Sequence, residues 1–192
     1  DLSQIDKFFE DIKELEVETL INNAGFALGT TDFENSELKD FENMIDVNIK
    51  GLLYVTRAIL PGMMKRTSGT IINLGSIAGR MAYPGGNVYC AKKSAVRTIS
   101  EAIRIDTVGR RVRCTDIELA RVRTNFETVR NFGDDVAGRK KYGLYEVLEA
   151  EDIADIALYA ASAPPHVVLQ EVLIASVDQP TATINKDSRH LA

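Results

Sequence analysis

Three side chains of this sequence could together move a proton to or from an oxygen atom: Ser76, Tyr89 and Lys93. A tyrosine hydroxyl has an ordinary pKa of about 10, so it needs a nearby cation before it exchanges protons readily at neutral pH. Lys93 lies four positions after Tyr89, which on a helix places its ammonium group on the same face as the phenol. Lys92 should point about 100° away and is not expected to serve this purpose. The spacing therefore predicts a tyrosine and lysine acid/base pair.

The third of these residues, Ser76, follows an apolar run at residues 70–74 that predicts a buried parallel strand. Open α/β sheets bind their ligands at the carboxyl ends of the strands, so the Ser76 hydroxyl can donate a hydrogen bond to a substrate oxygen. Carbonyl reduction by a nicotinamide needs a proton donor, a group that stabilises the developing alkoxide, and a cofactor that delivers hydride. Tyr89 and Ser76 could meet the first two needs.

The elements that must position these residues alternate between short apolar strands and longer stretches with helical periodicity. This alternation is typical of an α/β fold with a parallel sheet. No linker divides the chain, so residues 1–192 are expected to form a single domain. Strands are expected at residues 17–21, 70–74, 112–117 and 171–175, and helices at residues 4–15, 36–60, 87–109 and 151–163.

Local signals set the expected boundaries of these elements. Ser36 and Asn87 have side chains that can cap helices, and Pro61 should kink or end the helix in which it lies. Residues 119–147 have weak periodicity and three glycines, which predicts a mobile segment with one short helix that could form a substrate lid. The polar tail from Ile184 is expected to be loose.

The composition limits the classes of partner. The formal net charge is −5 and no long basic run occurs, so neither nucleic acid nor an anionic membrane is an expected partner. The two cysteines, Cys90 and Cys114, are far apart and outside any C-x-x-C pattern, so no metal site or disulfide is expected. No segment resembles a secretion signal or approaches the roughly 20 apolar residues of a membrane span, which favours a cytoplasmic location and small-molecule partners.

Further motifs surround the acid/base residues. Asn22-Asn23-Ala24-Gly25 ends one predicted strand, and Asn48, Ser76 and Tyr89-x-x-x-Lys93 follow in that order, with Tyr89 13 positions after Ser76. This order and spacing strongly resemble the short-chain dehydrogenase/reductase family. The flanking residues look most like those of the NADP-dependent 3-hydroxy acid dehydrogenases in this family, which oxidise serine and allo-threonine.

The resemblance implies catalytic roles for four residues. Tyr89 would be the acid/base, and Ser76 would donate to the substrate oxygen. Lys93 would lower the tyrosine pKa and contact the ribose, while Asn48 would hold a relay water. The cofactor-binding residues that the resemblance implies are Asp1, Asn22, Asn23, Ala24, Gly25, Tyr89, Lys93, Val122 and Thr124.

The resemblance also implies a cofactor and an assembly. The cofactor would be NADP, with NAD as the alternative, because the residues that decide between them follow the second strand of the family's fold. Asp1 would contact the adenine amine and Thr124 the nicotinamide amide. The family commonly forms homotetramers through the helices that here carry Asn48 and Tyr89.

Two departures from the family pattern concern the cofactor. Neither G-x-x-x-G-x-G nor G-x-G-x-x-G occurs, so the expected fold is a partial Rossmann-like, doubly wound parallel sheet that lacks its first three strands and their phosphate loop. The strand at residues 17–21 would then be an exposed edge. Where the family has a Pro-Gly turn, this sequence has Leu119-Ala120, and the Cβ of Ala120 would crowd the nicotinamide.

These observations leave three functional hypotheses. The first is an oxidoreductase that transfers hydride between NADP and the hydroxyl-bearing carbon of a small 3-hydroxy acid, such as serine or 3-hydroxybutyrate. The second is an inactive, truncated relative that acts only through protein contacts. The third is a broad carbonyl, sugar or steroid reductase, because residues 119–147, which should shape the substrate pocket, contain no decisive motif.

Overall fold

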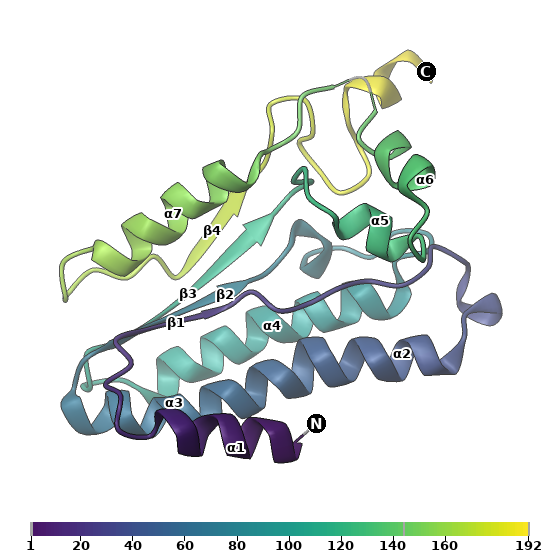
Figure 1. The fold of residues 1–192 in the computed structure, drawn as a ribbon. Helices are drawn as coiled ribbons and strands as arrows, with labels where there is room; N and C mark the ends of the chain where they lie inside the picture. The colour runs from purple at the N-terminus through teal and green to yellow at the C-terminus, as the bar shows by residue number, and fades with distance from the viewer. Residues whose placement is uncertain (1, 144, 192) are drawn as a thin grey trace.

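The computed structural model describes residues 2–143 and 145–191, and in this part of the chain it contains one parallel sheet. The strands follow one another across the sheet in the order β1-β2-β3-β4 (Figure 1). Their bounds are Thr19–Asn22 for β1, Gly69–Leu74 for β2, Val112–Leu119 for β3 and Glu171–Ile174 for β4. The α/β class and the partial Rossmann-like sheet are therefore confirmed. β1 forms one edge of the sheet, as expected, and its Ile21 is 50% exposed.

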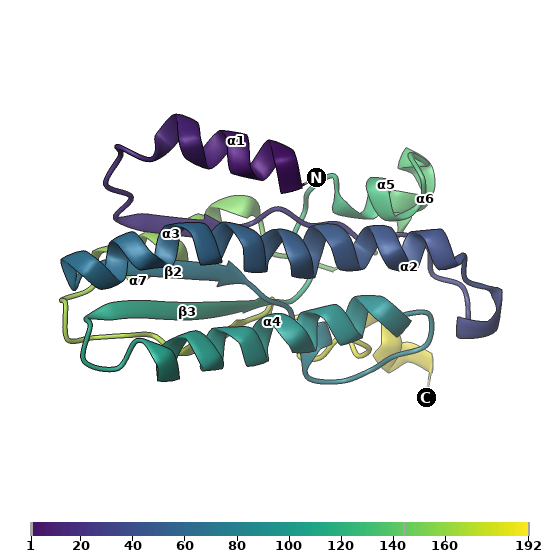
Figure 2. The same cartoon turned by 90° about the horizontal axis from the view of Figure 1, so that it is seen from below.

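Helices cover both faces of this sheet. Figure 1 shows α7 over one face, and α1, α3 and α4 over the other, an arrangement that Figure 2 shows from below. The helices are α1 (Leu2–Ile12), α2 (Leu38–Ile45), α3 (Leu52–Arg66), α4 (Asn87–Asp106), α5 (Phe126–Arg130), α6 (Asp135–Lys140) and α7 (Ala150–Ser162). A π-helical turn at Asp46–Gly51 joins α2 to α3, and 3-10 helices occur at Phe33–Asn35, Ile77–Gly79 and Lys186–Leu191.

The two faces of the sheet have separate apolar cores because successive side chains of a strand point to opposite sides. Ile71 of β2 packs with Met63 of α3 and Ile103 of α4. Its neighbour Ile72 packs on the other face with Ala160 of α7. Burial on both faces explains why β2 is almost continuously apolar.

The structure corrects three expected boundaries. Ser36 does not cap α2, because its hydroxyl donates to the Asp32 carbonyl at 3.0 Å, and Glu37 occupies the cap position. Asn87 is the first residue of α4 rather than its cap, a position that Gly86 takes. Pro61 does not end its helix, which continues to Arg66, because packing against the core outweighs the one hydrogen bond that proline removes.

Two segments that were expected to be largely irregular contain helices. Residues 119–147 contain the two helices α5 and α6, so the expectation of one short helix is wrong, while the mobility of the segment stays a prediction. Asp134 begins α6 by accepting hydrogen bonds from Val136 and Ala137, both at 3.0 Å. The tail after Ile184 includes the 3-10 helix Lys186–Leu191. In the described part of the chain, no helix combines the length and apolar character that crossing a membrane requires.

A buried amide ties the sheet to α4. The Asn73 side chain is fully buried, accepts a hydrogen bond from the Asn22 amide at 2.8 Å and donates one to the Ser100 hydroxyl at 2.8 Å. It thereby joins β1, β2 and α4 through polar contacts inside an otherwise apolar region.

We expect Asn73→Ala to lower the free energy of unfolding by about 2–3 kcal/mol, because it leaves buried partners of the amide unsatisfied. Thr98→Ala is the control, since the exposed Thr98 hydroxyl bonds only within its own helix. Urea unfolding curves of both variants measure the difference. Equal stability of the two variants would contradict the structural role of Asn73.

Candidate active site

Ser76 lies at the carboxyl end of β2, where the sequence places it. Its backbone is extended, and its side chain caps the 3-10 helix Ile77–Gly79 by accepting the Ala78 N–H at 3.1 Å. The hydroxyl also donates to the Leu119 carbonyl at the end of β3, at 3.2 Å. Ser76 is therefore anchored between two strand ends, and its rotatable hydroxyl hydrogen can be redirected to another acceptor.

Tyr89 lies in the first turn of α4, and the Ser76 hydroxyl is close enough to its phenol to act on the pKa of the phenol. The ring packs against Phe126 of α5, with 5.6 Å between the ring centroids. Burial raises the pKa of Tyr89 well above its usual value, while Ser76 and the positive charge of Arg130 oppose this rise. The phenol is consequently protonated at neutral pH and can act as an acid.

Lys92 is fully buried and Lys93 is half-buried, and the two lysines differ in their contacts. Lys93 Nζ donates to the Leu74 carbonyl at 2.5 Å, and burial lowers the Lys93 pKa to about 8. Lys92 is fully buried, its Nζ donates to the Phe26 carbonyl, and the same atom lies 4.7 Å from the centroid of the Tyr89 ring. The expectation that Lys92 points away from Tyr89 is wrong, because positions i and i+3 of a helix are also neighbours. Burial lowers the Lys92 pKa to about 6, so the group over the ring is largely the neutral amine at pH 7.

Asn48 lies in the π-helical turn and is buried. Its Oδ1 accepts the Phe26 N–H at 3.1 Å, and its Nδ2 donates to the carbonyls of Met44 at 2.7 Å and Phe26 at 3.2 Å. A Cβ at Gly25 would collide with Asn48 Oδ1, so glycine is required there for the close approach. Single π-turns inside helices are frequent at functional sites. Asn48 thus holds the segment after β1 against the helix, while its predicted contact with a relay water stays a prediction.

The remaining predicted residues occupy different environments. The Asn22 amide donates to Thr56 Oγ1 at 3.1 Å and to Asn73, so its side chain is engaged within the protein. Asn23, Ala24 and Gly25 are exposed. The Thr124 N–H donates to the Tyr142 hydroxyl at 3.1 Å, and Val122 pairs with Leu148 in an isolated β-bridge. Asp1 lies outside the described residues.

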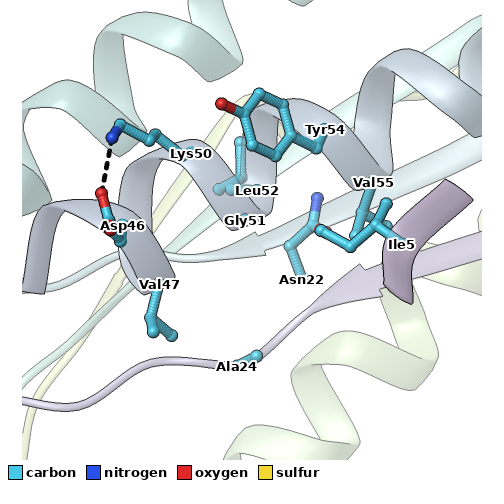
Figure 3. Close-up of a pocket in the computed structure, with 10 residues that line it drawn as sticks. All are labelled: Ile5, Asn22, Ala24, Asp46, Val47, Lys50, Gly51, Leu52, Tyr54 and Val55. Carbon is cyan, nitrogen blue, oxygen red and sulfur yellow. Dashed lines mark ion pairs between the residues drawn. The ribbon is translucent and has the colours of Figure 1, made fainter. Parts of the chain in front are cut away.

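A cavity of about 460 Å³ lies beside the end of β1 rather than at Tyr89 (Figure 3). It is lined by Asn22 and Ala24, by Ile5 of α1 and by residues of the π-turn and α3 that include Val47 and Tyr54. Asp46 and Lys50, also in its wall, form an ion pair of 2.6 Å, which raises the pKa of Lys50. The cavity therefore borders the predicted adenosine side and not the acid/base residues.

Comparison with known proteins gives a consistent result. The family profile described as short chain dehydrogenase matches residues 1–133. This chain belongs to the short-chain dehydrogenase family, a family of oxidoreductases. It is 44% identical over 171 residues to the NADP-dependent 3-hydroxy acid dehydrogenase YdfG of Salmonella typhi. The aligned residues make up 88% of this chain and 69% of that protein.

Two other relatives of this short-chain dehydrogenase are informative. Sulfoacetaldehyde reductase 2 of Chromohalobacter salexigens is 43% identical over 152 residues, 79% of this chain and 60% of that protein. The solved structure of the closed form of serine dehydrogenase complexed with NADP+ superposes with a TM-score of 0.92 at 40% identity, covering 96% of this chain and 76% of that chain.

The sequence analysis missed one buried acidic residue, whose charge acts on Lys93. Asp116 of β3 is fully buried, and neither of its carboxylate oxygens has a hydrogen-bond partner in the described part of the chain. Burial, with a contribution from Glu118, raises the Asp116 pKa to about 7, while Lys93 opposes the rise. An acidic residue within the strand predicted at residues 112–117 was the available signal. Within the described residues, no group of three or more His, Cys, Asp or Glu side chains could hold a metal ion.

Asp116 should make stability depend on pH. Its folded-state pKa lies above the usual 3.8, so the folded state binds the proton more tightly, and this stabilisation is lost as the pH rises toward 7. Between pH 4 and pH 7 we expect the wild type to lose about 2–4 kcal/mol of unfolding free energy relative to Asp116→Asn. Urea unfolding at several pH values measures this slope, with Asp155→Asn on the exposed side of α7 as control. Parallel pH profiles for wild type and Asp116→Asn would show that Asp116 is not the titrating group.

Proposed function

We propose that this chain is the acid/base and substrate-binding part of an oxidoreductase that transfers hydride between NADP and the hydroxyl-bearing carbon of a small 3-hydroxy acid. Serine and 3-hydroxybutyrate are the substrates that we favour. The observation that carries the proposal is that Ser76, at the carboxyl end of β2, acts on the Tyr89 phenol, while Lys93 donates to the Leu74 carbonyl at the end of the same strand. The names of the YdfG and serine dehydrogenase relatives support the substrate and cofactor classes.

The proposed reaction uses the chain's own residues for proton transfer. In the direction of carbonyl reduction, Tyr89 donates its proton to the substrate oxygen while Ser76 turns its hydroxyl from Leu119 toward the same atom. In the direction of alcohol oxidation, the tyrosine takes the proton back. Lys93 and a water held at Asn48 would then exchange that proton with solvent. The nicotinamide, when bound, supplies or accepts the hydride.

The residues that are present suit the nicotinamide and ribose half of NADP. Lys93 Nζ makes one hydrogen bond, to Leu74, which leaves two of its three N–H groups for ribose hydroxyls. Val122 and Thr124 would contact the nicotinamide, and the exposed Asn23, Ala24 and Gly25 the adenosine side. Asn22 would contribute through its backbone, because its amide is engaged. Asp1 is retained as a proposed adenine contact.

Several broader proposals accompany this function. We propose that residues 1–192 act as a single Rossmann-like unit, that the protein works in the cytoplasm, and that it assembles as a homotetramer through the π-turn region and α4. NAD remains the alternative cofactor, and a broad carbonyl or steroid reductase the alternative activity.

Tyr89→Phe should lower kcat by about a hundredfold or more, because the acid/base group is lost while the ring that packs on Phe126 remains. Tyr159→Phe is the matched control, since Tyr159 is exposed on α7. Turnover is followed by NADPH absorbance with serine and 3-hydroxybutyrate, and NADPH binding by fluorescence. Wild-type turnover in the Tyr89→Phe variant would contradict the assignment of Tyr89 as the acid/base residue.

The departure from the family pattern at Ala120 allows a test of the inactive alternative. Ala120, which replaces the family's glycine, is held at its position by an N–H bond to the Ile174 carbonyl of 2.9 Å. If its Cβ crowds the nicotinamide, Ala120→Gly should strengthen NADPH binding severalfold in a fluorescence titration. Saturable NADPH binding with turnover by the unaltered chain would defeat the inactive alternative, whereas no binding by either form would favour it.

A further inference from the structure

A buried carboxylate lies beside the end of β2, on the face of the sheet that α4 covers (Figure 2). Asp116 of β3 is fully buried and shares this face with Cys114, two residues earlier, which packs in the same cluster as Ile103 of α4. A Cβ at Gly75 would collide with Asp116 Oδ1, so glycine is needed there for the close approach of the carboxylate to the backbone.

Gly75 separates two residues that the proposed acid/base site uses. Leu74, on one side, accepts the hydrogen bond from Lys93 Nζ at 2.5 Å. Ser76, on the other side, is the proposed donor to the substrate oxygen. The carboxylate of Asp116 and the amine of Lys93 therefore approach the same short stretch of backbone, and the charge of Asp116 raises the pKa of Lys93 while that of Lys93 lowers the pKa of Asp116.

The other charged groups around Asp116 are engaged with one another. Glu118, on the same face of β3, forms an ion pair with Arg80. Glu171 of β4 pairs with Arg80 at 2.6 Å and with Arg104 of α4 at 3.8 Å. Both arginines thus have carboxylate partners other than Asp116.

Asp116 is also the one acidic group, among the described residues, whose charge raises the pKa of Lys93. Lys92, the neighbouring basic group on α4, is held largely neutral at pH 7 by burial and by the charge of Lys93. Burial disfavours a charge on Lys93 and on Asp116 alike, because the charged forms lose hydration. Their mutual attraction offsets this cost, since opposite charges attract more strongly in a dry environment than in water.

We propose that Asp116 is the counter-ion that keeps Lys93 positively charged, and that it is thereby a positioning residue for the proposed acid/base reaction. A charged Lys93 is what allows the Tyr89 phenol to release and regain its proton near neutral pH. Asp116 acts through Lys93 and does not contact the substrate or the cofactor. The kinetic consequence rests on the proposed function, whereas the pairing of the two charges does not.

The pairing operates in a defined range of pH. Lys93, with a pKa of about 8, is charged below this value, and Asp116, with a pKa of about 7, is charged above it. Both groups are therefore mainly charged between pH 7 and pH 8. Removal of the Asp116 charge should lower the pKa of Lys93 by about one pH unit, to about 7.

The charge on Lys93 can be measured without catalysis. Nuclear magnetic resonance of protein with isotope-labelled lysine follows the Lys93 side chain through a pH titration, and Lys93→Arg identifies its signal. We expect a midpoint near pH 8 for the unaltered protein and about one pH unit lower for Asp116→Asn and Asp116→Val. Valine has the size of aspartate and no polar atom to leave unsatisfied, so it guards against misfolding of the asparagine variant. Asp106→Asn, at an exposed position on α4, is the control and should not move the midpoint.

The consequence for turnover differs from that of a structural role. Activity that needs charged Lys93 is lost as the pH rises through the Lys93 pKa, so a lower pKa moves this loss to lower pH. For Asp116→Asn we expect kcat about threefold lower than that of the unaltered protein at pH 7.5 and nearly equal at pH 6. Asp106→Asn should match the unaltered protein at both pH values.

The two measurements fail separately. A shifted Lys93 midpoint in a protein without turnover would contradict the proposed function but support the pairing. An unshifted midpoint in a folded Asp116 variant would overturn the pairing, whatever the turnover. Equal losses of kcat at pH 6 and pH 7.5 would overturn the role of Asp116 in the reaction, because they would show that it only supports the fold.

Discussion

The backbone of Phe26 is the point on which the arrangement of the site depends. Its N–H donates to Asn48 Oδ1, and its carbonyl accepts from both Asn48 Nδ2 and Lys92 Nζ. These three bonds join the segment after β1, the π-turn and α4. Because Lys92 is one turn from Tyr89, the same carbonyl fixes the beginning of α4, and with it the phenol, relative to the end of the sheet. A shift of the Phe26 backbone would therefore displace residues from three separate parts of the chain.

Burial shifts the pKa values of several residues on α4 and β3. It raises the pKa of Tyr89, brings that of Asp116 to about 7 and lowers those of Lys92 and Lys93 to about 6 and 8. Electrostatic interactions are stronger in such a dry environment than in water. Several groups consequently change charge near neutral pH, which suits a site that must pass protons in both directions.

The sequence predicted the layers of the fold because their signals are local: the apolar runs define the buried strands. The four-residue spacing of Tyr89 and Lys93 favours one helix face, and their acid/base pairing stays a prediction. Lys92 escaped prediction because a long, flexible side chain can return to a neighbouring face. Arg130 escaped because α5 has five residues, too few to show periodicity, and its partners are distant in the sequence. The π-turn around Asn48 could not be predicted either, because it involves a contact with Phe26, 22 residues away in the sequence.

The central claim is that this site moves hydride from the carbon that bears the hydroxyl of a small acid, with Tyr89 taking the proton. The most direct measurement uses 3-hydroxybutyrate deuterated at carbon 3 and unlabelled NADP+, with mass analysis of the nicotinamide product. The account predicts that deuterium appears on the reduced nicotinamide and that the deuterated acid reacts more slowly than the unlabelled acid. Reduced cofactor without deuterium, or no reduced cofactor with any small hydroxy acid, would contradict it.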